Sequence, residues 1–118
     1  MPNSITLSAL IAYAHWADSI REHDDMFRDD AVLPDLRSTA QLRRNALRNQ
    51  SRTMTPMFVD VVTELVGEVG LSVTAVRDAG SGYNPDTGLA ELRAAALVSG
   101  YPYSIHINHE GKVSLVEQ

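Results

Sequence analysis

The chain has 118 residues, 44% of them hydrophobic, and a net charge of −5. This length and composition predict one globular domain, residues 1–118, with a single core, and exclude a two-domain protein. The negative charge excludes basic proteins of the histone kind, and the absence of cysteine excludes disulfides and sulfur-based zinc sites, which predicts a reducing, cytoplasmic location.

The first predicted element is an N-terminal helix capped by Ser4 or Thr6. Two adjacent apolar stripes follow the helical repeat: Leu7, Leu10, Ile11, Ala14 and Ala17, beside Tyr13, Trp16, Ile20 and Phe27. We expect the helix to stop near His23, because Asp29 and Asp30 would lie at the negative end of its dipole. Its apolar run is shorter than the roughly 18 to 20 residues that span a bilayer and lacks the basic start of a signal peptide, so no membrane partner is expected.

Charge reverses between the first and second helices. The segment from Asp18 to Asp35 holds seven acidic residues and two arginines, whereas the segment from Arg37 to Arg52 holds five arginines and no acid. Pro34 is expected to end the first helical region, and a second helix is predicted from about Asp35 to Gln50. At a helical turn of about 100° per residue, one face of this region collects four arginines: Arg37, Arg44, Arg48 and Arg52.

The third helix is predicted to begin with Thr55 as its cap and Pro56 at its first position, and to end at Gly70. Its core face recurs at helical spacing: Phe58, Val61, Val62, Leu65 and Val69. Its outer side carries acids at every fourth position: Asp60, Glu64 and Glu68. This amphipathic pattern predicts a helix packed on the core.

After Gly70 the hydrophobic period changes. Residues 71–76 alternate and predict a half-buried strand, and residues 78–87 predict a loop. Residues 87–97 predict a short helix that is closed by Gly100.

A C-terminal β-hairpin is predicted from alternation in residues 101–107 and, beyond a turn, in residues 113–116. The fold class is therefore α+β, with three N-terminal helices followed by a β-α-β-β unit. Because a strand-helix-strand connection is usually a right-handed parallel crossover, we expect a small three-stranded mixed sheet. The last strand leaves an open edge, which makes a homodimer possible.

Two short strings deserve comparison with a known fold: Met26–Val32 and Asn108–Val113. The first is similar to the turn after the first helix of the NTF2-like (SnoaL-like) family, and the second is similar to that family's last hairpin turn. The middle of the chain departs from the family, which has long consecutive strands where this sequence predicts helices. The resemblance implies a rival fold and a small-pocket enzyme. Its pocket would lie between the first helix and the sheet and be lined by Trp16, Tyr83 and Tyr103.

The four arginines that share one face are the first candidate site. Guanidinium groups bind carboxylates and phosphates through paired hydrogen bonds and stay charged at every relevant pH. The pattern therefore predicts a partner-binding surface for an acidic protein or for an RNA or DNA backbone. The alternative is a solvated face paired with the preceding acidic segment, since exposed ion pairs are common and contribute only about 0 to 1 kcal/mol each.

A glycine-rich loop that joins a strand to a predicted helix is a second, weaker candidate, because backbone amides at such a junction can hold an anion. Its ligand candidates are Gly80, Gly82, Tyr83 and Asp86. The loop lacks the lysine of a P-loop and the spacing of a dinucleotide fingerprint. A plain turn, with Pro85 at its second position and Thr87 as the cap of the next helix, is the favoured interpretation.

The histidines favour neither a metal site nor a catalytic centre. His106 and His109 flank the hairpin turn in different directions, and no third ligand accompanies His15 and His23. We therefore expect no metal and no cofactor, and assign no catalytic residue. The acidic segment could instead occupy a basic groove of a partner, as some small inhibitors do.

The sequence predicts a small non-catalytic interaction protein, of adaptor or inhibitor type, that binds a protein partner through charged helical surfaces. RNA or DNA binding through the arginines and an NTF2-like enzyme are the alternatives. An enclosed cavity with convergent histidine and carboxylate groups would favour the enzyme.

Overall fold

The computed structural model describes the backbone of residues 4–28 and 34–118, and their side chains except those of residues 23–28, 34–38 and 40. Three helices come first in this part of the chain: α1 (Ser4–Arg28), α2 (Pro34–Asn49) and α3 (Ser51–Glu68). Five strands follow: β1 (Val73–Asp78), β2 (Gly82–Tyr83), β3 (Ala90–Val98), β4 (Tyr101–Ile107) and β5 (Val113–Glu117). The α+β class and the three N-terminal helices are confirmed.

The described strands form an antiparallel sheet in the order β1-β3-β4-β5, with the short β2 paired to the start of β3. The predicted β-α-β-β unit with its parallel crossover and three-stranded mixed sheet is therefore wrong. The C-terminal hairpin is confirmed, since β4 and β5 pair from Tyr103 and Glu117 to Ile107 and Val113. β5 lies at an edge of the sheet, and a homodimer through this edge stays a prediction.

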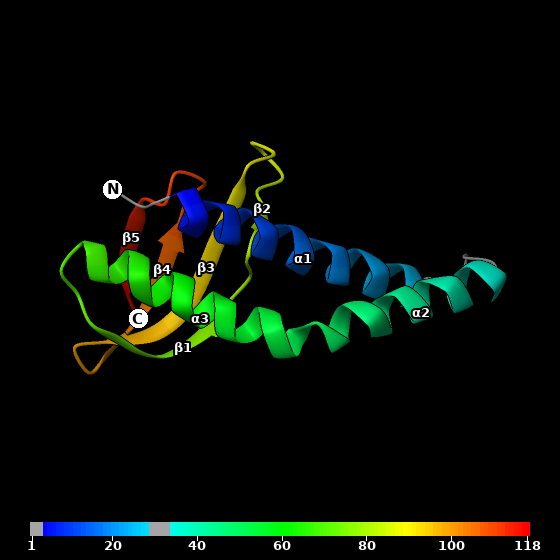
Figure 1. Ribbon diagram of the computed structural model, residues 1–118, viewed down its shortest axis with the longest axis horizontal. Helices are drawn as coiled ribbons and strands as arrows, with labels where there is room; N and C mark the ends of the chain where they lie inside the picture. The colour runs from blue at the N-terminus through cyan, green and yellow to red at the C-terminus, as the bar shows by residue number, and fades with distance from the viewer. Residues whose placement is uncertain (1–3, 29–33) are drawn as a thin grey trace.

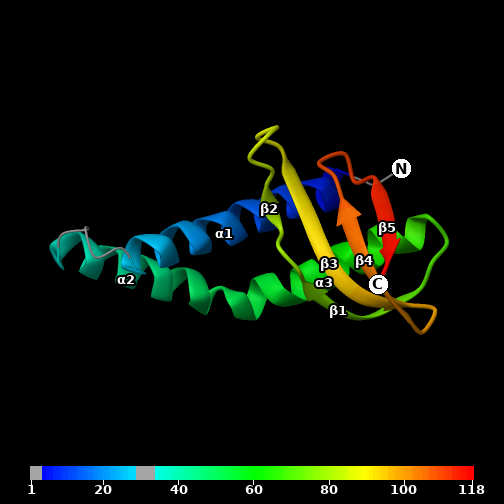
Figure 2. The ribbon, with the colours of Figure 1, turned by 180° about the vertical axis from the view of Figure 1, so that it is seen from behind.

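Helices α1 and α3 cover one face of the sheet, and no described element covers the other face (Figure 1; Figure 2). The helices supply one side of the core: Leu10, Tyr13, Ala14, Ala17, Phe58, Val61, Val62, Leu65 and Val66. The strands supply the other: Ala90, Leu92, Ala94, Ala96, Val98, Ile105 and Ile107. The predicted core face of α3 is correct except at its end, where Val69 is 57% exposed and Val66 is buried.

The clearest correction concerns residues 90–98, which form β3 and not a short helix. Leu92 and Ala94 face the core on alternate positions, and the alternation continues to Val98. Alanine and leucine favour a helix in isolation, but this segment pairs with β1 along one side and with β4 along the other. Pairing on both sides satisfies the backbone hydrogen bonds and outweighs the local preference.

Helix boundaries also differ from those predicted. α1 continues to Arg28 instead of stopping near His23. Pro34 opens α2, a position where the missing N–H of proline breaks no helical hydrogen bond. α3 begins at Ser51, ahead of its predicted cap, so Pro56 lies inside the helix.

Strand β1 begins two positions later than predicted, at Val73, and carries a bulge. Its register with β3 shifts between Thr74 and Arg77, and Ala75 has a φ of 54°. An extra residue of this kind reverses the side-chain alternation. As a result Val76 packs against the core although Ala75 is exposed.

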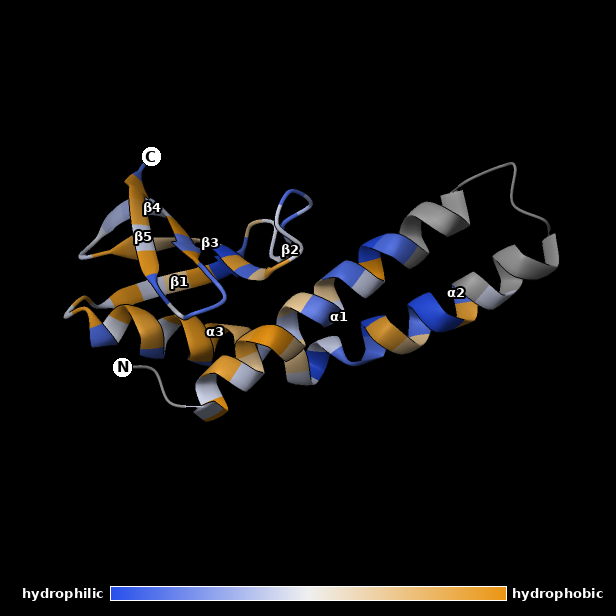
Figure 3. Ribbon diagram, turned by 90° about the horizontal axis from the view of Figure 1, so that it is seen from above, coloured by the Kyte–Doolittle hydropathy of each residue, from blue (hydrophilic) through white to orange (hydrophobic). Residues whose placement is uncertain are grey.

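The second half of α1 and the whole of α2, residues 18–28 and 34–49, form a helical arm that extends beyond the sheet (Figure 1). The molecule measures 51 × 29 × 29 Å. The base of the arm is tied by Trp16, whose Nε1 donates a hydrogen bond to the carbonyl of Leu47 at 2.9 Å. Figure 3 shows apolar residues gathered on α3 and the sheet, whereas α2 is mainly hydrophilic.

Candidate functional site

The predicted arginines lie along the arm and at the start of α3. Arg48 and Arg52 are exposed, and Arg44 is half-buried. Arg44 and Arg48 each have an interaction partner within the protein. Arg43, which the helical repeat places away from the other arginines, lines a shallow groove between α1 and α2. The side chain of Arg37 lies outside the described residues.

The predicted ligand loop is closed by hydrogen bonds to the protein's own carboxylates. Asp78 Oδ1 accepts from the amides of Gly80 and Ser81, at 3.1 and 2.9 Å. Asp18 Oδ2, on α1, accepts from the amide of Tyr83 at 3.1 Å. Three amides that could hold an anion therefore already donate to carboxylate oxygens.

Gly82 is buried where the loop crosses α1. Arg21 pairs with Asp18 at 2.7 Å and donates to the carbonyl of Ser81 at 2.5 Å. A Cβ atom at Gly82 would overlap the ends of the Asp18 and Arg21 side chains, so a larger residue would displace both from their present contacts. Asp86 is exposed farther along the loop. The structure thus brings Gly82 against α1 and leaves Asp86 exposed, and the anion site stays a prediction.

A charged cluster that the sequence did not predict lies on the uncovered face of the sheet. Glu91 is only 8% exposed, although it alternates with the core residue Leu92. Its Oε1 accepts from Arg93 Nε at 3.1 Å, and its Oε2 lies 2.8 Å from His106 Nε2. Arg93 and His106 are partners across β3 and β4, so the strand register places both beside one carboxylate. We call these three residues the Glu91 cluster.

The environment of Glu91 favours its ionised form. Burial raises the pKa of Glu91, but hydrogen bonds with His106, Arg93 and Asn84 lower it, and the net direction is downward. A carboxylate whose pKa is lower in the folded chain stabilises the fold above its ordinary pKa of 4.5. That stabilisation is lost as the pH falls through the folded pKa.

Replacing Glu91 with glutamine should make the thermal stability of the protein depend less on pH in the acidic range. Wild-type protein is expected to lose thermal stability between about pH 5 and pH 3, and Glu91→Gln should lose less over the same window, because its amide does not titrate. Thermal midpoints measured at half-unit pH intervals test this. Glu117→Gln, at an exposed position on β5, is the matched control and should follow wild type. An acid dependence in Glu91→Gln as steep as in wild type would contradict the assignment.

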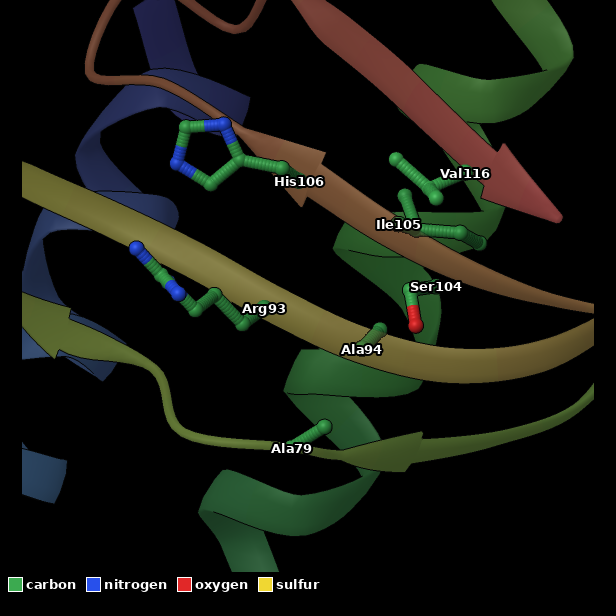
Figure 4. A pocket seen from close by; sticks show the side chains of 7 residues that line it. All are labelled: Ala79, Arg93, Ala94, Ser104, Ile105, His106 and Val116. Carbon is green, nitrogen blue, oxygen red and sulfur yellow. The ribbon is translucent and has the colours of Figure 1, made fainter. Parts of the chain in front are cut away.

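Two hollows open on the uncovered face. One, of about 290 Å³, is lined by Ala79, Arg93, Ala94, Ser104, Ile105, His106 and Val116 (Figure 4). The other, of about 320 Å³, is lined by Ala75, Arg77, Ala95, Ala96, Leu97, Pro102 and Gln118. Ala95 of the second hollow and Ser104 of the first are cross-strand partners. The hollows are therefore adjacent, and their shared middle is formed by short side chains.

The aromatic residues predicted for the rival enzyme pocket lie in different settings. Trp16 and Tyr103 pack at the margin of the core, whereas Tyr83 is on the loop with its ring centre 6.2 Å from that of His15. Across the described side chains of residues 4–28 and 34–118, no group of three histidine or acidic residues could hold a metal ion. Within the same residues, the helices are too short or too polar to cross a membrane.

Sequence reasoning missed the Glu91 cluster because it assigned residues 87–97 to a helix. Read with a period of two, the same residues place Glu91 and Arg93 together on the face opposite Leu92. The alternation of residues 90–98 was therefore the sequence signal that could have predicted this pair. The register between β3 and β4, which brings His106 to the cluster, cannot be predicted from the sequence.

Comparisons with known proteins assign no family. No protein-family model, curated protein or solved structure matches the chain. The resemblance to the NTF2-like family therefore has no support from relatives, and the string Met26–Val32 lies partly outside the described residues.

Proposed function

We propose that the chain is a non-catalytic interaction module that binds an acidic protein surface through its helical arm. The observation that carries this proposal is the exposure of arginines on an arm that lies outside the main core. α2 packs mainly on α1, and none of its described side chains, those of residue 39 and residues 41–49, belongs to the buried core cluster. The arm therefore contributes little to the core and offers most of its surface to a partner.

The composition of α2 suits a protein interface. From Gln41 to Asn49, every side chain is exposed except those of Arg44 and Leu47. Leu42 is 71% exposed on the same helix that carries Arg43 and Arg48. Protein interfaces are enriched in arginine beside apolar contacts, and guanidinium groups bind carboxylates in pairs. An acidic protein surface satisfies both kinds of group, whereas a phosphate backbone offers no apolar contact to Leu42.

Charge reversal on the arm tests the proposal. Fluorescence anisotropy of labelled acidic peptide, single-stranded RNA and duplex DNA would be recorded at low and moderate salt. Wild-type protein should bind the peptide, and Arg48→Glu with Arg52→Glu should weaken binding about tenfold, which corresponds to about 1.4 kcal/mol. The control, Arg77→Glu on β1 with Lys112→Glu in the turn before β5, makes the same charge change at exposed positions and should bind as wild type does.

Three outcomes would overturn the proposal. Equal weakening in the control pair would show that only net charge matters. If no polyanion binds at low salt and the variant Arg48→Glu with Arg52→Glu is less stable than wild type, the arginines act by pairing with the protein's own acidic segment. Tighter binding of RNA or DNA, with a logarithmic salt slope that reports the phosphates contacted, would favour the nucleic-acid alternative.

A further inference from the structure

We propose that the uncovered face of the sheet binds a small organic carboxylate with an apolar tail. The head group would lie beside Arg93 and His106, and the tail would lie over the adjacent hollows toward Leu97. This site is separate from the helical arm, so it goes beyond the proposed interaction function.

The shape of the face comes from side-chain size along two neighbouring strands. Ala95 and Ser104 are cross-strand partners in the middle of β3 and β4, and both are short. Longer side chains flank them, with Arg93 and His106 toward one end and Leu97 toward the other. The two resulting hollows, of about 290 and 320 Å³, are each close to the lower limit of roughly 300 Å³ for small-molecule sites.

The exposed part of the Glu91 cluster is cationic. The side chain of Glu91 is 11% exposed, whereas those of Arg93 and His106 are 52% and 42% exposed. A ligand at this end therefore meets the guanidinium and the imidazole, while the carboxylate lies beneath them. Arg77 lines the second hollow and adds a further positive charge to the same face. In a chain with a net charge of −5, this local excess selects an anion.

Glu91 also orients the two donors. Arg93 uses Nε and Nη2 to bind Glu91 at 3.1 and 3.0 Å, and its side chain remains 52% exposed. His106 Nε2 contacts Glu91 at 2.8 Å, and Figure 4 shows His106 and Arg93 at the same end of the hollow. A guanidinium held in place by one carboxylate loses less conformational entropy when it binds another.

Apart from Arg77 and Gln118 at the second hollow, the rest of the face suits an aliphatic tail. Val116 is 65% exposed and Leu97 is 37% exposed, and each lines one of the hollows. Ala95 and Pro102 add apolar surface between them. A chain that covers these groups removes apolar area from water while its carboxylate remains at the cationic end.

The test compares three ligands that differ by one feature each. Octanoate has both the charge and the tail, octanamide keeps the tail without the charge, and acetate keeps the charge without the tail. Titrations followed by ¹H–¹⁵N NMR should show octanoate shifting the amide signals of Arg93, Ser104, His106 and Val116. We expect octanamide and acetate to bind at least about tenfold more weakly, since each loses one half of the recognition.

Variants locate the site. Arg93→Met should weaken octanoate binding about tenfold and leave octanamide unchanged. Ala95→Phe fills the shared middle and should abolish binding of both, whereas Arg48→Glu on the arm with Arg52→Glu at the start of α3 should bind as wild type does. Octanamide binding as tightly as octanoate, or signal shifts confined to the arm, would overturn the proposal. This ligand comparison uses wild-type protein, so the test holds even for a variant that fails to fold.

Discussion

Replacing Leu65 with alanine is expected to lower the free energy of unfolding by about 2 to 5 kcal/mol, the cost of a cavity that the surrounding core cannot fill. Leu65 is fully buried on α3, in the cluster that also holds Phe58 and Ile105. It therefore lies in the layer where the helices meet the sheet. Urea denaturation, with the midpoint and slope fitted together, measures the change.

Val69→Ala is the control for this substitution. Val69 belongs to the same predicted stripe of α3 but is 57% exposed, so its truncation should change stability by no more than about 0.5 kcal/mol. The contrast between the two variants separates burial from helical spacing. A midpoint for Leu65→Ala equal to that of wild type would contradict the placement of α3 on the sheet.

The helices could be predicted because their core positions are set by local periodicity. Phe58, Val61 and Leu65 recur at helical spacing, and all three are buried. The C-terminal hairpin has the same local character, since alternation in β4 and β5 and the turn between them lie within a short stretch of chain. For such elements the local sequence alone predicts whether the segment is a helix or a strand.

Strand β3 could not be predicted in this way. Its alanines and leucines fit a helix, and only the antiparallel partners β1 and β4, which lie on either side in space, make the extended form preferable. The error then spread to the topology, because a helix at this point implies a parallel crossover. It also hid Glu91, whose position opposite Leu92 exists only in a strand.

The candidate sites show the same difference between features set by local sequence and features set by tertiary packing. Helical repeat alone predicts a shared face for Arg48 and Arg52, and both are exposed. The half-buried position of Arg44 depends on how α2 packs against α1, which the repeat of one helix does not contain. The hydrogen bonds of the glycine-rich loop could not be predicted for a similar reason, since Asp18, the acceptor for the amide of Tyr83, is 65 residues away in the sequence.

Replacing Asp78 with alanine is expected to have the second large effect, because its carboxylate joins α1 to the sheet and to the loop. Its Oδ2 accepts from the hydroxyl of Tyr13 at 2.8 Å, and its Oδ1 accepts from two loop amides. Tyr13 is 3% exposed, so the substitution leaves a buried hydroxyl without its acceptor. We expect a loss of about 2 to 3 kcal/mol, within the range for an unsatisfied buried donor and for hydrogen bonds to charged groups.

A double-mutant cycle with Tyr13→Phe isolates this contact. Phenylalanine keeps the ring that packs on Phe58, at 4.7 Å between ring centres, and removes only the donor. Asp78→Ala should therefore cost less in the Tyr13→Phe background than in wild type, with a coupling energy of about 0.5 to 3 kcal/mol. Asp78→Asn, which retains an acceptor oxygen, should be milder than Asp78→Ala in wild type.

Alkaline pH offers an independent measurement of the same hydrogen bond. Burial raises the pKa of Tyr13, and the hydrogen bond and the charge of Asp78 raise it further. Because the folded pKa lies above the unfolded value of about 10, protonated Tyr13 stabilises the fold fully below pH 10, and this contribution is lost as the pH rises beyond it. Tyr13→Phe has no proton to lose at this position, so its free energy of unfolding should fall less steeply above pH 10. A coupling energy near zero, with an alkaline loss equal to that of wild type, would show that Tyr13 and Asp78 do not stabilise each other.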